Sequence, residues 1–311
     1  MSTVPAPTGA QPATPVPTAA AREAAGRSRP PRGRVRPSAA VVRVVVLALG
    51  ALLFLVPFLS MVSGSLQVAA DPSPAGLLPG AGETTLDNYR AIDEAISLGS
   101  GLLNSGIFAG GVILATIVFG SLAGYALAQL EFRGRGAVFA LALLVQVVPF
   151  QLLLVPLYIL VARDYGLADT HLGVMLPFLV NSTAVIIFRQ YFLQLPQDVF
   201  EAARMDGASE LRVLRSVALP MVRPALLTVV LVTFIGPWNE FLWPFLVTKE
   251  ADQQPLAVSL ANFITTLSGQ VANPTGAVLA GACVLAAPAV ALFLVFQRRF
   301  TSTDIGSSVK G

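Results

Sequence analysis

Long apolar runs separated by short polar segments dominate the chain from Val44 onward. A helix that crosses the hydrocarbon core of a bilayer, about 30 Å thick, needs roughly 20 such residues. Six runs reach this length, and they cover approximately residues 41–66, 102–130, 137–162, 171–192, 224–247 and 276–297. The pattern therefore predicts an all-α, polytopic membrane protein with six transmembrane helices.

The first run also has features of a cleavable signal peptide, because arginines precede it and the small residues Ala69 and Ala70 follow it. The apolar core of a signal peptide, however, spans only about 7–15 residues. The stretch from Val44 to Met61 is longer. This favours a retained transmembrane helix over cleavage.

The basic residues predict the orientation of the chain in the membrane. On the side of the N-terminus lie 17 of the 20 Lys and Arg residues, whereas the opposite side holds only Arg90, Arg163 and Lys249. Positive residues are retained on the cytoplasmic side. We therefore expect both termini and the loop 193–223 to be cytoplasmic, and residues 67–101 to form an extracytoplasmic loop.

The two ends of the chain lack the regularly spaced apolar residues of a helix or a strand. Residues 1–38 are rich in Pro, Ala, Thr and Arg with almost no acid, and such a segment cannot bury enough apolar surface to fold. It is expected to be a disordered basic tail in the cytoplasm. Residues 301–311 form a second, shorter cytoplasmic tail.

Composition narrows the function classes. Hydrophobic residues make up 55% of the chain and charged residues 12%, against about 25% charged in soluble domains. A single cysteine, Cys283, and a single histidine, His171, exclude a disulfide framework and any site that needs two imidazoles. None of the motifs HExxH, GxSxG or GxxxxGK[ST] occurs. We expect no catalytic residue, cofactor or metal in this chain, and no nucleic-acid partner, because the basic residues lie at the ends of apolar runs.

Small residues four positions apart lie on one face of a helix and let another backbone approach. This spacing predicts either helix packing inside one subunit or a dimer face. The pairs are Gly106 with Gly110, Gly120 with Gly124, and Ala277 with Gly281.

The loop 193–223 contains the capping and helix-ending residues that predict two short helices. Pro196 suits the first helical position, and Asp198 suits the first turn. Gly207 is expected to cap the first helix and Ser209 to begin a second one. The second helix is expected to run to about Ala218, with prolines 220 and 224 ending it and opening the next apolar run.

The first of these helices carries a small apolar surface between charged residues, formed by Phe200, Ala203 and Met205. A helix that lies on a membrane favours Lys and Arg on one face and bulky apolar residues on the other. The smaller side chains here favour entry into a protein cleft. A simple connector is the alternative.

A spaced set of motifs in this loop resembles one family of transporters. Its members are Glu201-Ala202-Ala203, Asp206-Gly207-Ala208, Leu219-Pro220 and Pro224. The set is similar to the EAA...DGA...LP...P pattern of membrane subunits of binding-protein-dependent ABC importers. Segments around Pro149, Pro156, residues 166–170 and residues 188–196 resemble the carbohydrate-uptake branch, and the second membrane subunit of maltose-type importers above all, over about residues 98–300.

The resemblance implies a type I ABC importer permease fold, in which the loop is a coupling helix seated in a cleft of the ATP-hydrolysing subunit. The resemblance implies that Glu201 and Gly207 contribute most to this docking. The full set expected to dock is Phe200, Glu201, Ala202, Ala203, Asp206, Gly207 and Ala208. The implied partners are a second homologous permease in a heterodimer, two ATP-binding subunits that use ATP and Mg²⁺, an extracellular solute-binding protein and a sugar.

One carboxylate lies inside an apolar run. Burying such a group costs about 2.5–3.5 kcal/mol, which makes Glu240 a candidate for the translocation path. Trp238 and Asn239 precede it and could supply the aromatic and planar polar groups that bind sugars. The alternative is that Glu240 reaches water or a neighbouring helix near the outer end of its span and only fixes packing.

Polar residues interrupt two other runs. Asn181, Ser182 and Thr183 break the fourth, and Gln146 lies near Pro149 in the third. Such groups must face protein or a cavity. Asn181 and Ser182 are therefore candidates for the translocation path, and hydrogen bonds between helices are the alternative explanation.

The outer segment 248–275 is polar, with Gln253, Gln254, Asn262 and Asn273. The resemblance implies that it meets the solute-binding protein and can reach toward the sugar. Without the resemblance, a solvated connection is favoured.

Other functions predict other patterns. An ion-driven secondary transporter is expected to carry more buried carboxylates or an inverted repeat, and an intramembrane enzyme needs a catalytic set. The sequence shows one carboxylate inside an apolar run, no inverted repeat and no catalytic set. An ABC importer for peptides, amino acids, polyols or phosphate is the remaining alternative.

Overall fold

The structure is a computed structural model that describes residues 37–71, 73 and 84–303, with side chains from residue 41 to residue 297. Nearly all of the tail expected at 1–38, and most of the tail expected at 301–311, lie outside the described residues. The chain divides after Leu55 into two units. The packing reported below is that of the second unit.

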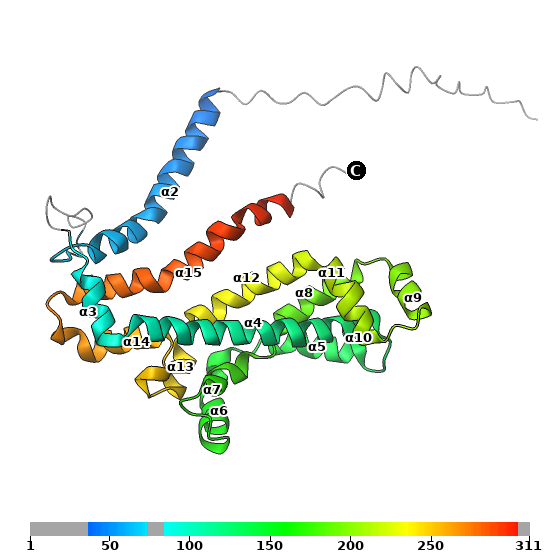
Figure 1. The fold of residues 1–311 in the computed structure, drawn as a ribbon. Coiled ribbons are helices and arrows are strands. Elements are labelled where there is room, and N and C mark those ends of the chain that lie inside the picture. The colour runs from blue at the N-terminus through cyan, green and yellow to red at the C-terminus, as the bar shows by residue number, and fades with distance from the viewer. Residues whose placement is uncertain (1–36, 72, 74–83, 304–311) are drawn as a thin grey trace, which may run out of the picture. The chain divides into compact units, whose positions relative to one another are not determined.

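Helices form the regular structure of the described residues, apart from one antiparallel bridge between Gln67 and Thr84. This is the all-α architecture expected from the apolar pattern. The α-helices (Figure 1) are α2 (Pro37–Ser65), α3 (Asp87–Ile96), α4 (Leu98–Gln129), α5 (Arg135–Val145), α6 (Leu154–Tyr158), α7 (His171–Met175), α8 (Ser182–Leu193), α9 (Gln197–Met205), α10 (Glu210–Val213), α11 (Leu219–Met221), α12 (Arg223–Asn239), α13 (Leu242–Val247), α14 (Leu256–Asn262) and α15 (Pro274–Thr303). Shorter 3-10 turns are η2 (Phe150–Leu153), η4 (Leu176–Phe178), η6 (Ala251–Gln253) and η8 (Ser268–Gln270), and π-helical turns are η3 (Ile159–Asp164), η5 (Leu214–Ala218) and η7 (Phe263–Leu267).

Three described helices have the length and apolar composition to cross a membrane singly, namely Val41–Ser65, Leu98–Gln129 and Pro274–Gln297. Three pairs of helices meet the same test only together, and each pair is sharply bent at a short break. The number rises to six if each bent pair is one span. Six transmembrane helices therefore stay a prediction.

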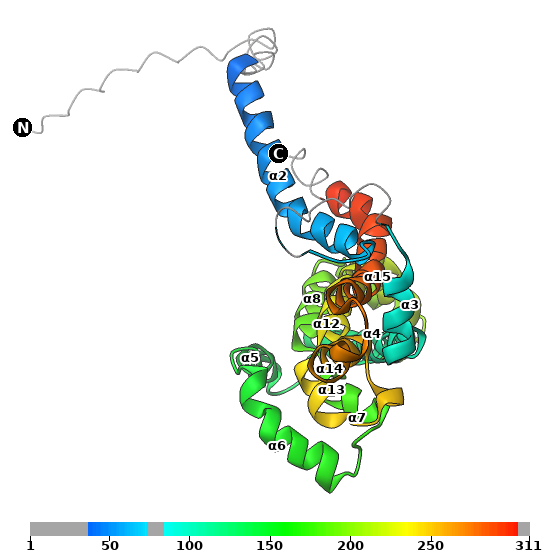
Figure 2. The same ribbon diagram turned by 90° about the vertical axis from the view of Figure 1, so that its left-hand side faces the viewer.

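The run expected to form one transmembrane helix over 137–162 is divided into two helical segments. Helix α5 and the segment Phe150–Asp164 meet at 92° (Figure 2). Pro149 stands at this break with an extended ψ of 128°. Proline has no N–H to donate and its ring crowds the preceding turn, which weakens the helix at this point. The extended backbone of Pro149 then ends it.

The expected runs 171–192 and 224–247 are also interrupted. Residues 171–178 and α8 meet at 51°, at a break that ends at Asn181. Helix α12 ends at Asn239, and α13 begins only at Leu242, because the intervening Glu240 has an extended ψ of 122°. Both breaks carry polar side chains.

Helix α4 is central to the second unit and packs against α8 and α12 (Figure 1). A Cβ atom on Gly124 would lie 2.6 Å from the Cβ of Phe188 on α8, and Gly120 faces the same helix. Apart from the adjoining residues and backbone of α4 itself, no described residue lies within 4 Å of a Cβ built on Gly106 or Gly110. The second glycine spacing of α4 therefore serves packing within the subunit, and the first does not.

We expect Gly124→Val to destabilise the subunit by about 1–3 kcal/mol, the usual cost of overpacking a filled contact. Gly110→Val makes the same change at an open position of the same helix and is expected to cost no more than about 0.5 kcal/mol. Thermal unfolding of the purified subunit in detergent measures both. Equal losses would contradict the packing of α4 on α8 through Gly124.

Two buried clusters mark the two ends of α4. At one end Tyr125 joins Phe188 and Phe200, and at the other end Leu98 joins Leu256. Figure 1 shows α9 beside the first end and α3 and α14 beside the second. The loop that contains α9 and the outer segment that contains α14 therefore lie at opposite ends of α4.

Candidate functional site

The loop between α8 and α12 folds as two helices around Gly207. Helix α9 ends in a Schellman motif, in which the Ala208 N–H donates to the Ala203 carbonyl (3.1 Å) and the Gly207 N–H to the Arg204 carbonyl (3.0 Å). Gly207 has a φ of +79°. This conformation costs other L-residues about 1–2 kcal/mol, so the turn itself requires the glycine.

The ends of these helices differ slightly from the expectation. Pro196 is the cap before α9 rather than its first residue, and its backbone is extended with a ψ of 130°. Ser209 stands at the cap of α10, but its side chain makes no capping hydrogen bond. The second helix continues past Ala218 to Met221 through the π-helical turn η5, and Pro220 lies within α11.

Phe200 attaches α9 to the rest of the subunit. Its side chain is 0% exposed and lies in one cluster with Phe192 of α8 and Val213 of α10. Its ring centroid is 6.3 Å from that of Tyr125 on α4. The expectation that Phe200 belongs to a docking surface is therefore wrong. A helix as short as α9 needs a bulky apolar side chain in the core to hold it.

The other residues expected to dock lie at or near the surface. Met205, next to them, is 87% exposed, and Leu211, which the sequence pattern did not single out, is 65% exposed. Neither ion pair in the described part of the chain includes Glu201. The exposed members are Glu201, Ala202, Asp206 and Gly207, and the half-buried members are Ala203 and Ala208. The surface thus combines an unpaired carboxylate with exposed methionine and leucine side chains, and methionine is enriched at protein interfaces.

Three hydrogen-bonded side chains, which we call the clasp, join the two loop helices to α4. The guanidinium of Arg204 donates from Nε to Oε1 of Glu210 (2.8 Å) and from Nη2 to Oε2 (3.3 Å). The Tyr125 hydroxyl donates to the same Oε2 (2.5 Å). The hydrogen bonds that Arg204 donates hold the pKa of the Glu210 carboxyl below its ordinary value, so the ion pair is retained at neutral pH. The clasp fixes α9 against α10 and both against α4.

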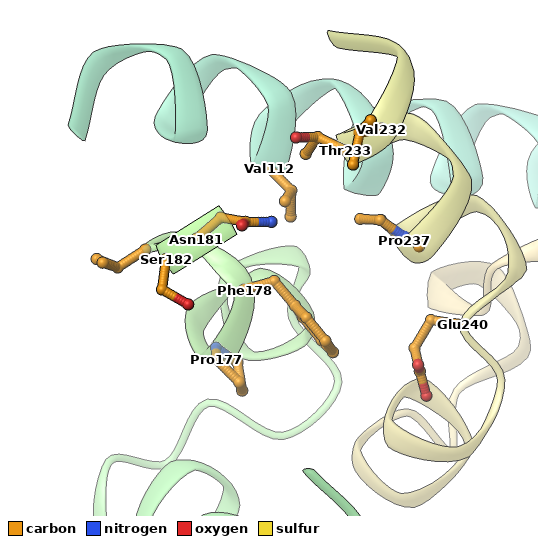
Figure 3. A pocket seen from close by; sticks show the side chains of 11 residues that line it. Val112, Pro177, Phe178, Asn181, Ser182, Val232, Thr233, Pro237 and Glu240 are labelled. Atoms are coloured by element: carbon orange, nitrogen blue, oxygen red, sulfur yellow. The ribbon is translucent and has the colours of Figure 1, made fainter. Parts of the chain in front are cut away.

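A pocket of about 280 Å³ lies where the breaks before α8 and after α12 face the middle of α4 (Figure 3). Val112 of α4, Asn181 and Ser182 at the start of α8, and Glu240 after α12 all line it. Three of the five residues expected on a translocation path therefore meet in one place. Thr233 and Pro237 also line the pocket, and the sequence pattern did not indicate either of them.

The polar side chains of the pocket are held by the backbone. Asn181 Oδ1 accepts the Ala184 N–H (3.2 Å) and caps α8. Glu240 Oε1 accepts the Trp243 N–H (3.2 Å) at the start of α13. Figure 3 shows the Asn181 amide directed between Val112 and Pro237. One oxygen of each group is thus occupied, and their other polar atoms are left for the pocket.

Trp238 and Asn239 do not line the pocket, so their place on a translocation path stays a prediction. The Trp238 indole is buried, stacks on Phe234 (centroids 5.1 Å apart) and donates to the Leu285 carbonyl (2.9 Å). Asn239 donates to the Ile235 carbonyl one turn earlier (2.9 Å). Adjacent residues of a helix point in different directions, and of residues 238–240 only Glu240 lines the pocket.

The outer segment 248–275 folds back onto α4. Asn104 of α4 donates to the carbonyls of Asp252 (2.7 Å) and Gln254 (3.1 Å). Gln254 is buried, and its Oε1 accepts from Asn262 (2.9 Å). The alternative of a solvated connection is therefore wrong. The amides of Gln254 and Asn262 hold the segment in place.

The comparison with protein families gives the class of the chain. The family described as "Binding-protein-dependent transport system inner membrane component" matches residues 116–301, which contain both loop helices and most of the pocket. The chain belongs to this family. It is a multi-pass membrane protein and a transport permease, and its relatives are transport subunits rather than enzymes.

Individual relatives of the permease match over most of their length. It is 31% identical over 263 residues to the arabinooligosaccharides transport system permease protein AraQ of Bacillus subtilis (strain 168), covering 84% of this chain and 92% of that protein. It is 35% identical over 260 residues to the trehalose transport system permease protein SugB of Mycobacterium tuberculosis (strain CDC 1551 / Oshkosh), covering 83% and 93%. A solved chain from a bacterial ABC transporter involved in the import of the acidic polysaccharide alginate superposes with a TM-score of 0.77 at 25% identity, covering 88% of the permease and 100% of that chain. The permease therefore shares its fold with a subunit of an ABC importer.

Proposed function

We propose that the permease is a membrane subunit of an ATP-driven importer that carries a sugar or an oligosaccharide across the cytoplasmic membrane of a prokaryote. The solute class is proposed from the relatives named for arabinooligosaccharide and trehalose transport. The observation that carries the proposal is the exposed surface around Gly207, which is anchored to α4 on one side and open on the other. A surface built in this way is suited to receive a partner.

The proposed importer contains a second homologous permease, two ATP-binding subunits and an extracellular solute-binding protein. ATP and Mg²⁺ belong to the ATP-binding subunits, and this chain holds no cofactor. With six spans and both termini in the cytoplasm, the loop 193–223 meets the ATP-binding subunits. The segment 248–275, at the other end of α4, then meets the solute-binding protein.

Coupling is proposed to run through the contacts that attach the loop helices to the membrane helices. Glu201 pairs with a basic residue of the ATP-binding subunit, and Gly207 lets the two backbones approach closely. Phe200 and the clasp then transmit the movement to α8 and α4, because these contacts hold α9 to them.

The pocket is proposed to be this subunit's part of the solute path. Asn181, Ser182 and Glu240 present hydrogen-bonding groups that suit the hydroxyls of a sugar. Its volume of about 280 Å³ lies just below the range of about 300–1,000 Å³ of complete ligand pockets. We therefore expect the second permease to complete the path.

The proposal is tested in proteoliposomes that contain the whole importer and a radiolabelled sugar. We expect uptake to require ATP, the solute-binding protein and both permeases. Uptake by this chain alone without ATP would instead indicate an ion-driven transporter. ATP-driven uptake of a peptide or an amino acid, but of no sugar, would support the role as an importer subunit and contradict the proposal that the solute is a sugar.

Tyr125→Phe is expected to reduce the number of solute molecules transported per ATP hydrolysed. The change removes one hydrogen bond of the clasp, worth about 1 kcal/mol, and leaves the ring in place. Uptake and phosphate release are measured in the same proteoliposomes. Tyr165→Phe, at a tyrosine that is 58% exposed, is the matched control. A normal ratio in Tyr125→Phe would exclude the clasp from coupling.

A further inference from the structure

The pocket between the breaks of α8 and α12 contains one ionisable side chain. Glu240 is the only charged residue among the 11 that line it. Asn181, Ser182 and Thr233 are polar and neutral, and the remaining residues are apolar or glycine. The lining therefore contains no Lys or Arg that could balance the carboxylate.

The position of the Glu240 carboxylate is fixed. Its backbone is extended at the end of α12, and its Oε1 accepts the Trp243 N–H (3.2 Å). Neither of the two ion pairs in the described part of the chain includes Glu240. A carboxylate without a counterion in a half-buried site interacts with other charges more strongly than one in bulk water.

Neutral hydrogen-bonding groups complete the lining. Asn181 uses only its Oδ1 to cap α8, and within the described residues its Nδ2 and the Ser182 hydroxyl make no hydrogen bond. These groups can donate to and accept from the hydroxyls of a sugar without adding a positive charge. The pocket thus offers an uncharged polyol several hydrogen bonds and offers an anion no compensation.

We infer that Glu240 makes this pocket selective for uncharged sugars and excludes solutes that carry a carboxylate or a phosphate. The inference rests on the proposed function, which supplies the sugar as solute, and adds that this sugar is uncharged. The comparisons leave that charge open, because two relatives are named for arabinooligosaccharides and trehalose, which are neutral, and the solved transporter is described with an acidic polysaccharide.

The effect of Glu240 on charged molecules is measurable without knowing the solute. In the assembled importer, Ser182→Cys places a thiol on the pocket, and Cys283→Ala removes the native one. The rates of modification by cationic 2-trimethylammonioethyl methanethiosulfonate and anionic 2-sulfonatoethyl methanethiosulfonate are compared with and without Glu240→Gln. Glutamine keeps the oxygen that accepts the Trp243 N–H, so the local fold is preserved.

We expect the cationic reagent to react faster than the anionic one, and Glu240→Gln to reduce the ratio of the two rates by about tenfold, the scale of one unit charge several ångströms away. Thr265→Cys, exposed in the outer segment, is the control, and its ratio should not change. An unchanged ratio at Ser182→Cys, or an equal change at Thr265→Cys, would overturn the inference. Failure of both reagents to react at Ser182→Cys would also overturn it, because the pocket would then be closed to solutes.

Sugar uptake by the wild-type importer separates this inference from the proposed function. Uptake of a neutral sugar with an unchanged rate ratio would keep the proposed function and remove Glu240 as its selector. If Glu240→Gln lowers the ratio of cationic to anionic modification as expected but the importer takes up no sugar, Glu240 still excludes anions and the proposed sugar substrate is wrong.

Discussion

Gly207→Val is expected to reduce ATP-driven uptake at least tenfold while the permease still inserts into the membrane. Gly207 has a φ of +79°, which costs a residue with a Cβ about 1–2 kcal/mol and a β-branched one more. A strain of about 1.4 kcal/mol lowers the equilibrium population of the Schellman turn, relative to opened conformations, by a factor of ten. When the turn opens, the exposed residues of α9 leave their positions. Uptake and the amount of ATP-binding subunit that copurifies in detergent are the measurements.

Two variants separate backbone strain from docking. Gly134→Val introduces the same strain at a φ of +87° with equally open surroundings, but outside the loop, and is expected to retain most of the uptake. Gly207→Asn preserves the left-handed turn and adds a side chain, so its failure would show that close backbone approach is needed as well. Normal uptake with Gly207→Val would refute the docking role of this turn.

Phe200→Ala is expected to destabilise the isolated permease by about 3–5 kcal/mol, the range for removing a buried phenylalanine side chain. The ring is 0% exposed between α4, α8 and α10, so its loss leaves a cavity under α9. In the assembled importer the same variant is expected to hydrolyse ATP with little transport. Thermal unfolding is measured on the permease without its partners, because a residue that only docked would not affect it.

Phe293→Ala is the matched control, since Phe293 is 58% exposed on α15. It is expected to change stability by no more than about 0.5 kcal/mol. Phe200→Leu keeps an apolar side chain in the cavity and should recover part of the loss. If Phe200→Ala unfolds at the same temperature as the wild type, Phe200 does not anchor α9.

The features that follow from local chemistry could be predicted from the sequence. The turn at Gly207 is one, because the left-handed conformation is a property of the residue and its immediate neighbours. The break at Asn181 is another, since a polar cap interrupts an apolar run. The break at Pro149 was missed, although the proline itself is its signal, because the apolar run around it is long enough for a whole span.

Features that depend on tertiary contacts could not be predicted. Phe200 has the composition of a docking residue, and only its burial against α4 and α8 shows that it faces inward. The same holds for Trp238, whose indole binds a carbonyl 47 residues away. The contact between Tyr125 and Glu210 joins residues 85 positions apart, and no periodic pattern in one sequence encodes such a pair.

The length of α4 has a mechanical consequence. Tyr125 lies 13 residues after Val112 and 27 after Leu98 in this single helix, which at 1.5 Å per residue places them about 20 Å and about 40 Å away. If α4 tilts as a rod about the clasp, about 10° of rotation displaces Val112 by about 3 Å and Leu98 by about 7 Å. Such a lever displaces the Leu98 end about twice as far as the pocket, so under the proposed coupling a small rotation of the loop helices produces a larger movement at the opposite end of α4.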